Sequence, residues 1–371
     1  MFGLKWVIRL ILLAALIAWL GLVSACRTAP PSGSRGETQA PRQTLRVFCA
    51  GSLILPFTEL EKAFEAVYPE IDVQNECHGS IQVIRHVTEL HELIDVVATA
   101  DHALIPMLMY SRNDTDSGRP YADWYIRFAG NHVALAYTTS SRFAGEIQTE
   151  NWFEILSRPD VKIGLADPRF DAAGYRALMV LTLAEDEYEV EGLYDHLVRN
   201  AFTWPITRFF DEEFTEIYVP EIVEPIQGSN MVLRGSSIQL IALLESGDLD
   251  YAFEYESVVA QHGLLSVSLP DAINLGSQAF QKEYVQVQVK LDFQRFSSVK
   301  PVFQGEPIGY GITIPSNAPE PALAERYLTF VLSPEGRAVM EAAHHPLLTP
   351  VECNQPDQIP PLLRGYCQDA D

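Results

Sequence analysis

Two Gly-Ser turns in this chain could together bind a small anion. Ser52 ends the sequence Cys-Ala-Gly-Ser and Ser80 ends Glu-Cys-His-Gly-Ser, and each follows a short β-branched or aromatic run and opens an apolar helical pattern. Such a turn directs backbone N–H groups, a hydroxyl and the positive end of the helix dipole toward one point. One turn of this kind is most often only an N-cap, but two on neighbouring strands form a pocket for an anion. The pair therefore predicts an anion-binding site.

Two carboxylates farther along the chain add a different chemistry. Asp171 precedes a predicted helix, and Glu254 lies in the apolar, aromatic strand Leu249–Tyr255. The ordinary role for Asp171 is that of a carboxylate favoured by the dipole at a helix N-terminus. The ordinary role for Glu254 is a salt bridge at a strand end, with Arg234 or Arg176 as the partner. Both ordinary roles stay open on the residues alone.

Strands and helices alternate along the chain, as is typical of an α/β fold. Strands are expected at 45–48, 71–73, 94–98, 131–138, 161–166 and 249–255, and helices after both Gly-Ser turns and at 102–109, 151–156, 175–184 and 238–246. Ser236 and Gln239 form a predicted capping box for the last helix, and Gly247 is its stop signal. The β-α-β-α-β order indicates a parallel sheet with helices on both faces. Ligands of such sheets bind outside the carboxyl ends of the strands, where both Gly-Ser turns fall.

The N-terminus has the pattern of a lipoprotein signal peptide. Lys5 and Arg9 precede an apolar stretch over 10–25, and the Val-Ser-Ala before Cys26 resembles a lipobox, in which the cysteine is diacylated. The alternative is a membrane-spanning anchor, but the stretch is short for the roughly 20 residues that a spanning helix needs. Residues 1–26 are thus predicted as a signal peptide with lipidated Cys26, and residues 27–43, rich in Pro, Gly, Ser and Thr, as a flexible tether. We expect an extracytoplasmic protein anchored to the cell membrane.

The formal net charge of -23 excludes nucleic acid and acidic lipid surfaces as partners. The same charge repels anions in bulk solution, which argues against an anion site. However, contacts within a few ångströms decide binding in a recessed site, and surface charge is screened beyond about 10 Å at ordinary salt. The chain after the tether is long enough for two domains.

Four cysteines besides Cys26 suit two disulfides in an oxidising compartment. Cys353 and Cys367 flank a short Pro-rich C-terminal segment and are expected to close it. Cys49 and Cys77 each stand three residues before a turn serine, so they could bridge if their strands are neighbours. Buried free thiols at these two positions are the alternative. A metal site is not indicated, because there is no CxxC and no clustered histidine spacing.

Long blocks of the chain resemble the tungstate/molybdate-binding proteins of ABC importers, in the branch typical of archaea. The resemblance runs from about residue 45 to about 350 and includes AGSLILPFTELEKAFEAVYPEIDV, GSIQVIRHVTEL, DVVATADHALIPMLM, LLESGDLDYAFEYESVVAQHGL and YGITIPSNAP. It implies a type II periplasmic-binding-protein fold, with two α/β lobes joined by two crossover strands. The expected limits are 45–138 plus 308–350 for lobe 1, 139–307 for lobe 2 and 351–371 for a C-terminal tail.

The resemblance also implies how the ligand is held. Ser52 and Ser80, with main-chain amides, match the family's oxyanion donors, and Asp171 and Glu254 match the two carboxylates that complete a distorted octahedron around the metal. The chain departs from the family at Ala172, where a proline is usual. Tungsten(VI) and molybdenum(VI) are hard Lewis acids that accept two more oxygen ligands, whereas sulfate and phosphate would only be repelled by the carboxylates.

The sequence therefore predicts a lipid-anchored solute-binding protein that delivers tungstate or molybdate to an ABC permease. It is expected to be a monomer with no cofactor apart from its ligand. A phosphate- or sulfate-binding lipoprotein is the alternative. A hydrolase that uses Ser52 with His78 is disfavoured because the chain has no GxSxG elbow, so no enzymatic activity is expected.

The lipobox gives a direct test. Cys26→Ser should leave the precursor unlipidated and move much of the protein out of the membrane fraction, because only the cysteine thiol can accept the lipid. Mass spectrometry and membrane partitioning measure both effects. An unchanged mass and unchanged partitioning would exclude the lipobox.

Overall fold

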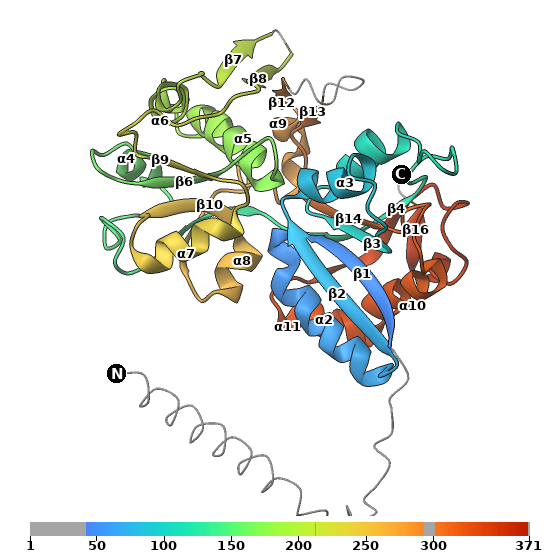
Figure 1. Ribbon diagram of the computed structural model, residues 1–371. Helices are drawn as coiled ribbons and strands as arrows, with labels where there is room; N and C mark the ends of the chain where they lie inside the picture. The colour runs from blue at the N-terminus through green and yellow to red at the C-terminus, as the bar shows by residue number, and fades with distance from the viewer. Residues whose placement is uncertain (1–41, 212, 293–300, 370–371) are drawn as a thin grey trace, which may run out of the picture. The chain divides into compact units, whose positions relative to one another are not determined.

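The computed structural model describes residues 42–211, 213–292 and 301–369, and these form three β-sheets with helices around them (Figure 1). The predicted signal peptide, Cys26 and residues 27–41 of the predicted tether lie outside the described residues. In the described part, none of the helices combines the length and apolar character needed to cross a membrane.

The first lobe is built on a seven-stranded sheet with the order β16-β15-β4-β14-β3-β1-β2. β2 and β3 both pair with β1 in parallel, but β14 is antiparallel to β3 and β4, so the sheet is mixed and not parallel throughout. The strands are β1 (Gln43–Ala50), β2 (Ile71–His78), β3 (Val96–Thr99), β4 (Tyr125–Gly130), β14 (Gly309–Thr313), β15 (Leu347–Asn354) and β16 (Cys367–Asp369).

In the first lobe, helices follow the two Gly-Ser turns and β3, and further helices lie in the C-terminal part of the chain. They are η1 (Gly51–Leu53), α2 (Ile54–Val67), α3 (Ser80–Thr88), η2 (Pro106–Tyr110), α10 (Pro321–Leu332), α11 (Pro334–Ala342) and η6 (Arg364–Tyr366). The apolar face of α2, with Phe57, Leu60 and Phe64, is buried, and α2 packs against α10 and α11 (Figure 1). The helix expected at 102–109 is instead the short π-helical η2, which has Pro106 in its first turn.

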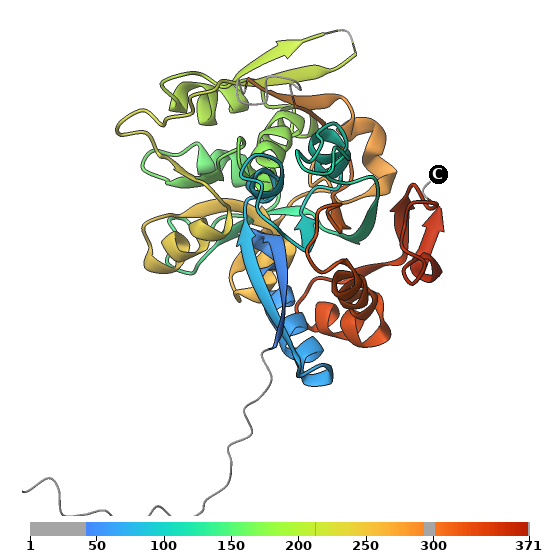
Figure 2. The same cartoon turned by 45° about the vertical axis from the view of Figure 1, so that its right-hand side comes forward.

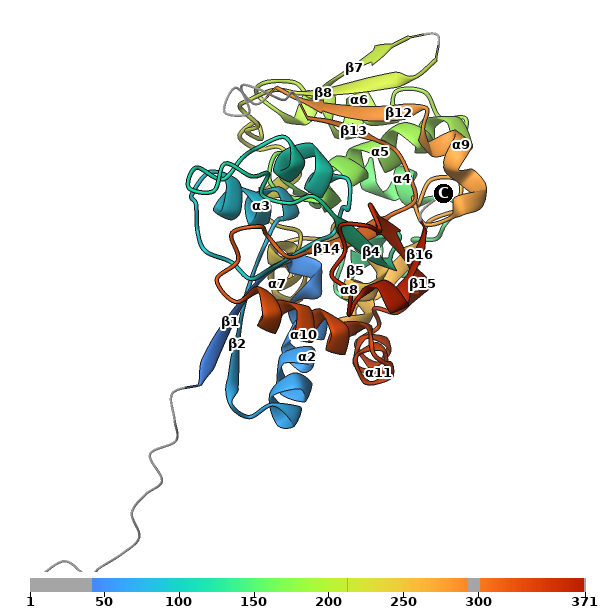
Figure 3. The same ribbon diagram turned by 90° about the vertical axis from the view of Figure 1, so that its right-hand side faces the viewer.

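The second lobe has a five-stranded sheet, β11-β5-β10-β6-β9, and a four-stranded sheet, β13-β12-β8-β7. Figure 3 shows the strands of the four-stranded sheet. The strands are β5 (Val133–Tyr137), β6 (Ile163–Ala166), β7 (Thr207–Phe210), β8 (Thr215–Val219), β9 (Met231–Arg234), β10 (Tyr251–Tyr255), β11 (Leu265–Ser268), β12 (Val287–Leu291) and β13 (Val302–Gln304). The helices are α4 (Trp152–Leu156), α5 (Ala172–Glu187), α6 (Leu193–Leu197), η3 (Arg199–Ala201), α7 (Ile238–Ser246), α8 (Glu256–Gln261), η4 (Gln278–Phe280) and α9 (Gln281–Tyr284).

Helix α5 joins the two sheets of the second lobe. It contacts β6 and β10 of the five-stranded sheet and β12 of the four-stranded sheet. Every residue from Ala172 to Ala184 is therefore buried, which explains why this helix is apolar on nearly all sides.

The chain crosses between the lobes twice, once between β4 and β5 and again between β13 and β14. The first crossing is short, because only Asn131 and His132 separate β4 from the following strand. As a result β5, which the expected limit of 138 assigned to lobe 1, pairs with β10 and β11 of the second lobe. Residues 351–369 of the expected tail contribute to β15 and β16 at the edge of the first sheet.

The two Gly-Ser turns leave the same edge of the first sheet. β1 and β2 lie side by side in Figures 1 and 2, and their register places Cys49 opposite Cys77. A disulfide joins these two cysteines, whose Cα atoms are 4.4 Å apart. A second disulfide joins Cys353 to Cys367. Since the strands are parallel and aligned, Ser52 and Ser80 follow them at equivalent positions.

Candidate anion-binding site

Both turn serines are buried and each accepts or shares one hydrogen bond. Ser80 is the first residue of α3, and its Oγ accepts the N–H of Ala100 over 2.9 Å. Ser52 lies in η1, and its Oγ is 2.9 Å from the Tyr310 hydroxyl. The exposed fractions of Ser52 and Ser80 are only 3 % and 1 %. Each hydroxyl is therefore held in place by the first lobe.

Asp171 is the N-cap of α5. Its Oδ1 accepts the N–H of Ala173 over 2.9 Å, as expected for a carboxylate at a helix N-terminus. Its Oδ2 accepts the N–H of Ser237 over 3.0 Å. Burial raises the pKa of Asp171, and the two N–H bonds oppose that rise by stabilising the charged form. The capping role is real, but it engages only one of the two carboxylate oxygens.

Glu254 is buried in β10 and only half of its carboxylate is satisfied. Oε1 accepts the N–H of Tyr255 over 2.7 Å and the hydroxyl of Ser237 over 3.1 Å. Oε2 is buried and has no hydrogen-bond partner among the described residues. Burial raises the pKa of the Glu254 carboxyl to about 8, and the nearby charge of Asp171 adds to this rise. A buried acceptor without a partner is costly unless a ligand satisfies it.

Among the described residues no cation forms an ion pair with either carboxylate, although the charge of Arg176 lowers the pKa of Asp171. Arg176, the partner considered for Glu254, has its Nη2 3.4 Å from Asp101. Arg234, the other candidate, donates to the carbonyl of Leu233. The ion-pair alternative for Glu254 is therefore not found in the structure.

A third Gly-Ser turn belongs to the same site, and we did not predict this from the sequence. Gly235, Ser236 and Ser237 connect β9 to α7, and Ser237 bonds both carboxylates. Ser236 Oγ has no hydrogen-bond partner in the described chain, although it lies close enough to Asp171 to favour the charged carboxylate and so lower its pKa. The predicted capping box is wrong, because α7 begins after Ser237 without a side-chain cap. The repeated strand–Gly-Ser–helix pattern was the available signal.

Glycines let the turns of the two lobes approach each other closely. A Cβ atom at Gly51 would lie 2.8 Å from Ser236 Oγ, and one at Gly79 would lie 2.3 Å from the carbonyl oxygen of Phe170. The same carbonyl accepts the N–H of Ile81 over 3.1 Å. Next to these contacts is a cavity of about 310 Å³, lined by residues of both lobes that include Cys77, His78, Gln82, Phe170, Ser236 and Gln239. None of Ser52, Ser80, Asp171 and Glu254 lines this cavity. The close approach of Gly51 to Ser236, and of Gly79 to Phe170 and Asp171, nevertheless brings the turns that carry them to one region between the lobes.

A second set of contacts ties the lobes together beside the site. Arg176 of α5 donates to the carbonyl of Ala100 over 2.6 Å and to the Tyr255 hydroxyl over 2.7 Å. Its neighbour Tyr175 donates to the carboxylate of Asp101. These bonds join the start of α5 to the loop after β3.

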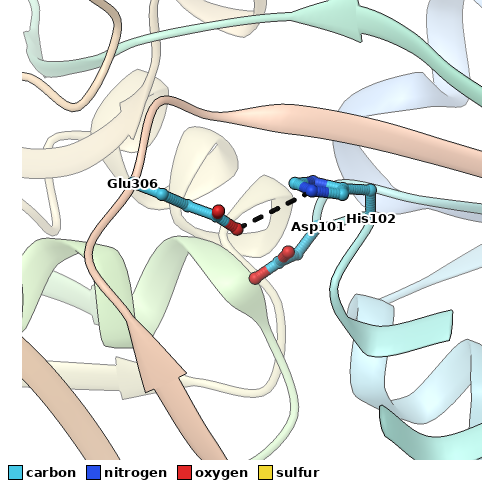
Figure 4. Close-up of side chains that lie close together, drawn as sticks. All are labelled: Asp101, His102 and Glu306. Atoms are coloured by element: carbon cyan, nitrogen blue, oxygen red, sulfur yellow. Dashed lines mark ion pairs between the residues drawn. The ribbon is translucent and has the colours of Figure 1, made fainter. Parts of the chain in front are cut away.

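Asp101, His102 and Glu306 form a cluster of potential metal ligands at this contact (Figure 4). His102 Nε2 and Glu306 Oε1 are 3.9 Å apart, and burial with the charge of Asp101 raises the pKa of Glu306 to about 7. However, Arg176 pairs with Asp101, and the charges of Arg176 and Arg127 also lower the pKa of Glu306. Two guanidinium groups would repel a divalent cation. We therefore interpret this cluster as part of the tie between the lobes and not as a metal centre.

The hydrolytic alternative has no geometric support among the described residues. The hydrogen-bond partner of Ser52 is Tyr310, and His78 Nε2 is 2.8 Å from Glu76 instead. A serine nucleophile needs a base within hydrogen-bond reach. The region contains serine hydroxyls and helix N-termini, which can donate hydrogen bonds, next to two buried carboxylates.

The raised pKa of Glu254 predicts how stability depends on pH. The folded protein holds this proton up to about pH 8, whereas the unfolded chain loses it near pH 4.5, so the contribution of Glu254 to stability falls as the pH rises between these values. Glu254→Gln cannot titrate, so its ligand-free melting temperature should exceed that of the wild type at pH 8 and converge with it near pH 4.5. Glu245→Gln, an exposed change on α7, is the matched control. A lower melting temperature for Glu254→Gln at pH 8 would contradict this reading.

Comparison with known proteins places the chain in a family. The family model for bacterial extracellular solute-binding proteins matches residues 45–344. The molybdate/tungstate-binding protein WtpA of Thermococcus kodakarensis is 36% identical over 342 residues, which cover 90% of each chain. WtpA of Pyrococcus abyssi is 37% identical over 341 residues, 88% of this chain and 92% of that protein. The resemblance drawn from the sequence is confirmed by these relatives.

Solved structures agree on the fold. The periplasmic molybdate-binding protein of Azotobacter vinelandii matches with a TM-score of 0.53 at 15% identity, over 81% of this chain and 98% of that one. The predicted periplasmic-binding-protein fold is thus confirmed. With the family match over most of its length, the chain belongs to the bacterial extracellular solute-binding proteins.

Proposed function

We propose that the protein is an extracytoplasmic solute-binding lipoprotein that captures tungstate or molybdate and delivers it to an ABC permease. The observation that carries this proposal is the pair of buried carboxylates, Asp171 and Glu254, which lie without a cation partner beside the serine hydroxyls of the Gly-Ser turns. The names of the WtpA relatives support the same ligand class.

The carboxylates distinguish this ligand class from sulfate and phosphate. A carboxylate about 4 Å from a dianion costs several kcal/mol even at an effective dielectric near 20. Tungstate and molybdate can offset this cost, because their metal is a hard Lewis acid that accepts further oxygen ligands. Glu254 Oε2 is an acceptor with no partner in the described chain and is suited to such a bond. Sulfate has no open coordination position to offer in return.

The proton on Glu254 distinguishes tungstate and molybdate from sulfate by whether binding releases a proton. With a pKa of about 8, the carboxyl is mostly protonated at pH 7 in the ligand-free protein. Coordination to tungsten or molybdenum requires the carboxylate, so binding releases a proton. Sulfate would instead accept a hydrogen bond from the protonated acid and leave the proton in place.

Delivery to a permease and membrane anchoring rest on the family and on the sequence of the N-terminus. Solute-binding proteins of this family serve import systems, and the lipobox before Cys26 supplies the anchor in this proposal. A monomer with one site between its lobes is the simplest form that can present a closed, loaded state to a permease.

Glu254→Gln tests the coordination chemistry. The amide keeps the shape but is a poor metal ligand, so tungstate binding should weaken about tenfold or more, that is, by roughly 1.4 kcal/mol or more. Sulfate binding should not weaken, because the side-chain amide of glutamine can donate the hydrogen bond that the protonated acid gives to sulfate. Calorimetry at pH 7 in buffers of different ionisation enthalpy should show proton release with tungstate for the wild type and none for the variant.

Glu245→Gln again serves as the control and should bind both anions like the wild type. An unchanged ratio of tungstate to sulfate affinity in Glu254→Gln, without any proton release in the wild type, would reduce the site to one for plain tetrahedral oxyanions.

Gly79→Ala tests whether the ligand is held by the closed arrangement of the lobes. The backbone at Gly79 has φ -59° and ψ 141°, which alanine adopts readily, so the change acts through the close contacts with the backbone of Phe170 and Asp171. We expect weaker tungstate binding and a melting temperature close to that of the wild type. Gly145→Ala is the control, because a Cβ there meets no atom within 4 Å. Equal tungstate affinity in both variants would show that this close approach is not needed.

A further inference from the structure

A chain of hydrogen bonds connects the candidate site to both crossings between the lobes. Ser52 Oγ lies 2.9 Å from the hydroxyl of Tyr310, and that hydroxyl lies 3.1 Å from Nδ2 of Asn131. Asn131 is in the first crossing, between β4 and β5, and Tyr310 is in β14, directly after the second crossing. Tyr310 is fully buried, so water does not compete for these bonds.

The orientation of the Asn131 amide sets the direction of this chain. Its Oδ1 accepts the N–H of His132 over 3.0 Å, and since only an oxygen can do so, Nδ2 must face the other way. The two Nδ2 hydrogens then go to Ser257 Oγ, at 2.8 Å, and to Tyr310. Tyr310 accepts from Asn131, so its own hydrogen is available for Ser52 Oγ. Burial raises the pKa of Tyr310, which keeps this hydrogen on the phenol.

The consequence is that the hydrogen of the Ser52 hydroxyl is left for another acceptor. Ser80 is in the same condition, because its Oγ already accepts the N–H of Ala100. Two hydroxyls that accept from the protein and keep their own hydrogens form a donor pair. An oxyanion, which only accepts hydrogen bonds, is the matching ligand.

We propose that Asn131 and Tyr310 are positioning residues that turn the Ser52 hydroxyl into a hydrogen-bond donor toward the bound oxyanion. This proposal rests on the proposed anion-binding function. It adds that the donor character of the site is set by a side chain in the first crossing, two hydrogen bonds away from the ligand.

Asn131→Asp reverses the direction of the hydrogen bonds between Asn131, Tyr310 and Ser52 and provides the main test. The introduced carboxylate cannot donate, so the hydrogen of Tyr310 turns to it, and Ser52 must then donate to Tyr310 and present lone pairs to the anion. We expect tungstate affinity to fall about 10- to 100-fold, as for a lost hydrogen bond to a charged group. Tyr310→Phe removes the hydrogen bond that Ser52 Oγ accepts but leaves the hydrogen of the Ser52 hydroxyl free for the anion. Tungstate affinity should therefore fall less than about tenfold.

A double-mutant cycle separates this effect from simple charge repulsion. In Asn131→Asp combined with Tyr310→Phe, no phenol hydroxyl remains to which Ser52 must donate its hydrogen. The tungstate affinity should therefore return close to that of Tyr310→Phe alone. Charge repulsion predicts additive losses instead, because the carboxylate is present in both backgrounds. Ser52→Ala combined with Asn131→Asp gives a second cycle and should be non-additive in the same way, because without the Ser52 hydroxyl there is no donor left to reverse. Melting temperatures identify any variant that is not folded.

Titrations of the full chain with sodium tungstate and with sodium sulfate distinguish the possible failures. Non-additive cycles with the bound anion support the positioning role. Additive cycles overturn it, even where the wild type binds tungstate as proposed. Binding of sulfate alone by the wild type would overturn the tungstate proposal but still allow the cycle to test Asn131 and Tyr310. A wild type that binds neither anion would overturn both.

Discussion

The buried carboxylate of Glu254 imposes the constraint around which the site is arranged. Removing a carboxylate from water is unfavourable unless hydrogen bonds or a counter-charge compensate. Here a backbone N–H and the Ser237 hydroxyl satisfy one oxygen, and the other oxygen is left without a partner in the described chain. The fold can maintain this because β10 lies in the middle of its sheet, between β5 and β6. Stability is thus given up locally, as is common at functional sites.

The contacts between the lobes show that the arrangement does not depend on a ligand alone. Arg176 and Tyr175 form a buried set of bonds across the lobes with Asp101 and the carbonyl of Ala100. Opening the lobes would separate these groups and return their charges to water. A ligand shifts the equilibrium between open and closed lobes only by its differential affinity for the two states. Because these bonds already favour the closed state, the anion must supply less of the free energy of closure.

Local patterns in the sequence predicted the parts of the site that depend on short stretches of chain. The Gly-Ser turns identified Ser52 and Ser80, and parallel pairing of β1 with β2 brings them together. Asp171 and Glu254 gained their proposed ligand roles only from the resemblance, because nothing in their own neighbourhoods distinguishes a ligand from a cap or an ion-pair partner.

Other parts of the site could not be predicted because they depend on contacts between distant residues. Tyr310 is 258 positions from Ser52, and Asn131 is 179 positions from Tyr310. Tyr310 opens the block YGITIPSNAP, but nothing in that block indicates that its first residue contacts Ser52. The early crossing after β4 was missed for a similar reason: the run 131–138 looks like one strand, and only its pairing with β10 shows to which lobe it belongs.

The disulfide between Cys49 and Cys77 also has a mechanical consequence. β1 is the first strand of the described chain and therefore the one on which a pull from the N-terminal side would act. Such a force could separate β1 from its neighbours residue by residue, but the covalent bond to β2 stops this separation at Cys49. The bond therefore holds together the two strand ends from which the Gly-Ser turns leave. A protein held at its N-terminus could in this way be stretched without any change in the spacing between Ser52 and Ser80.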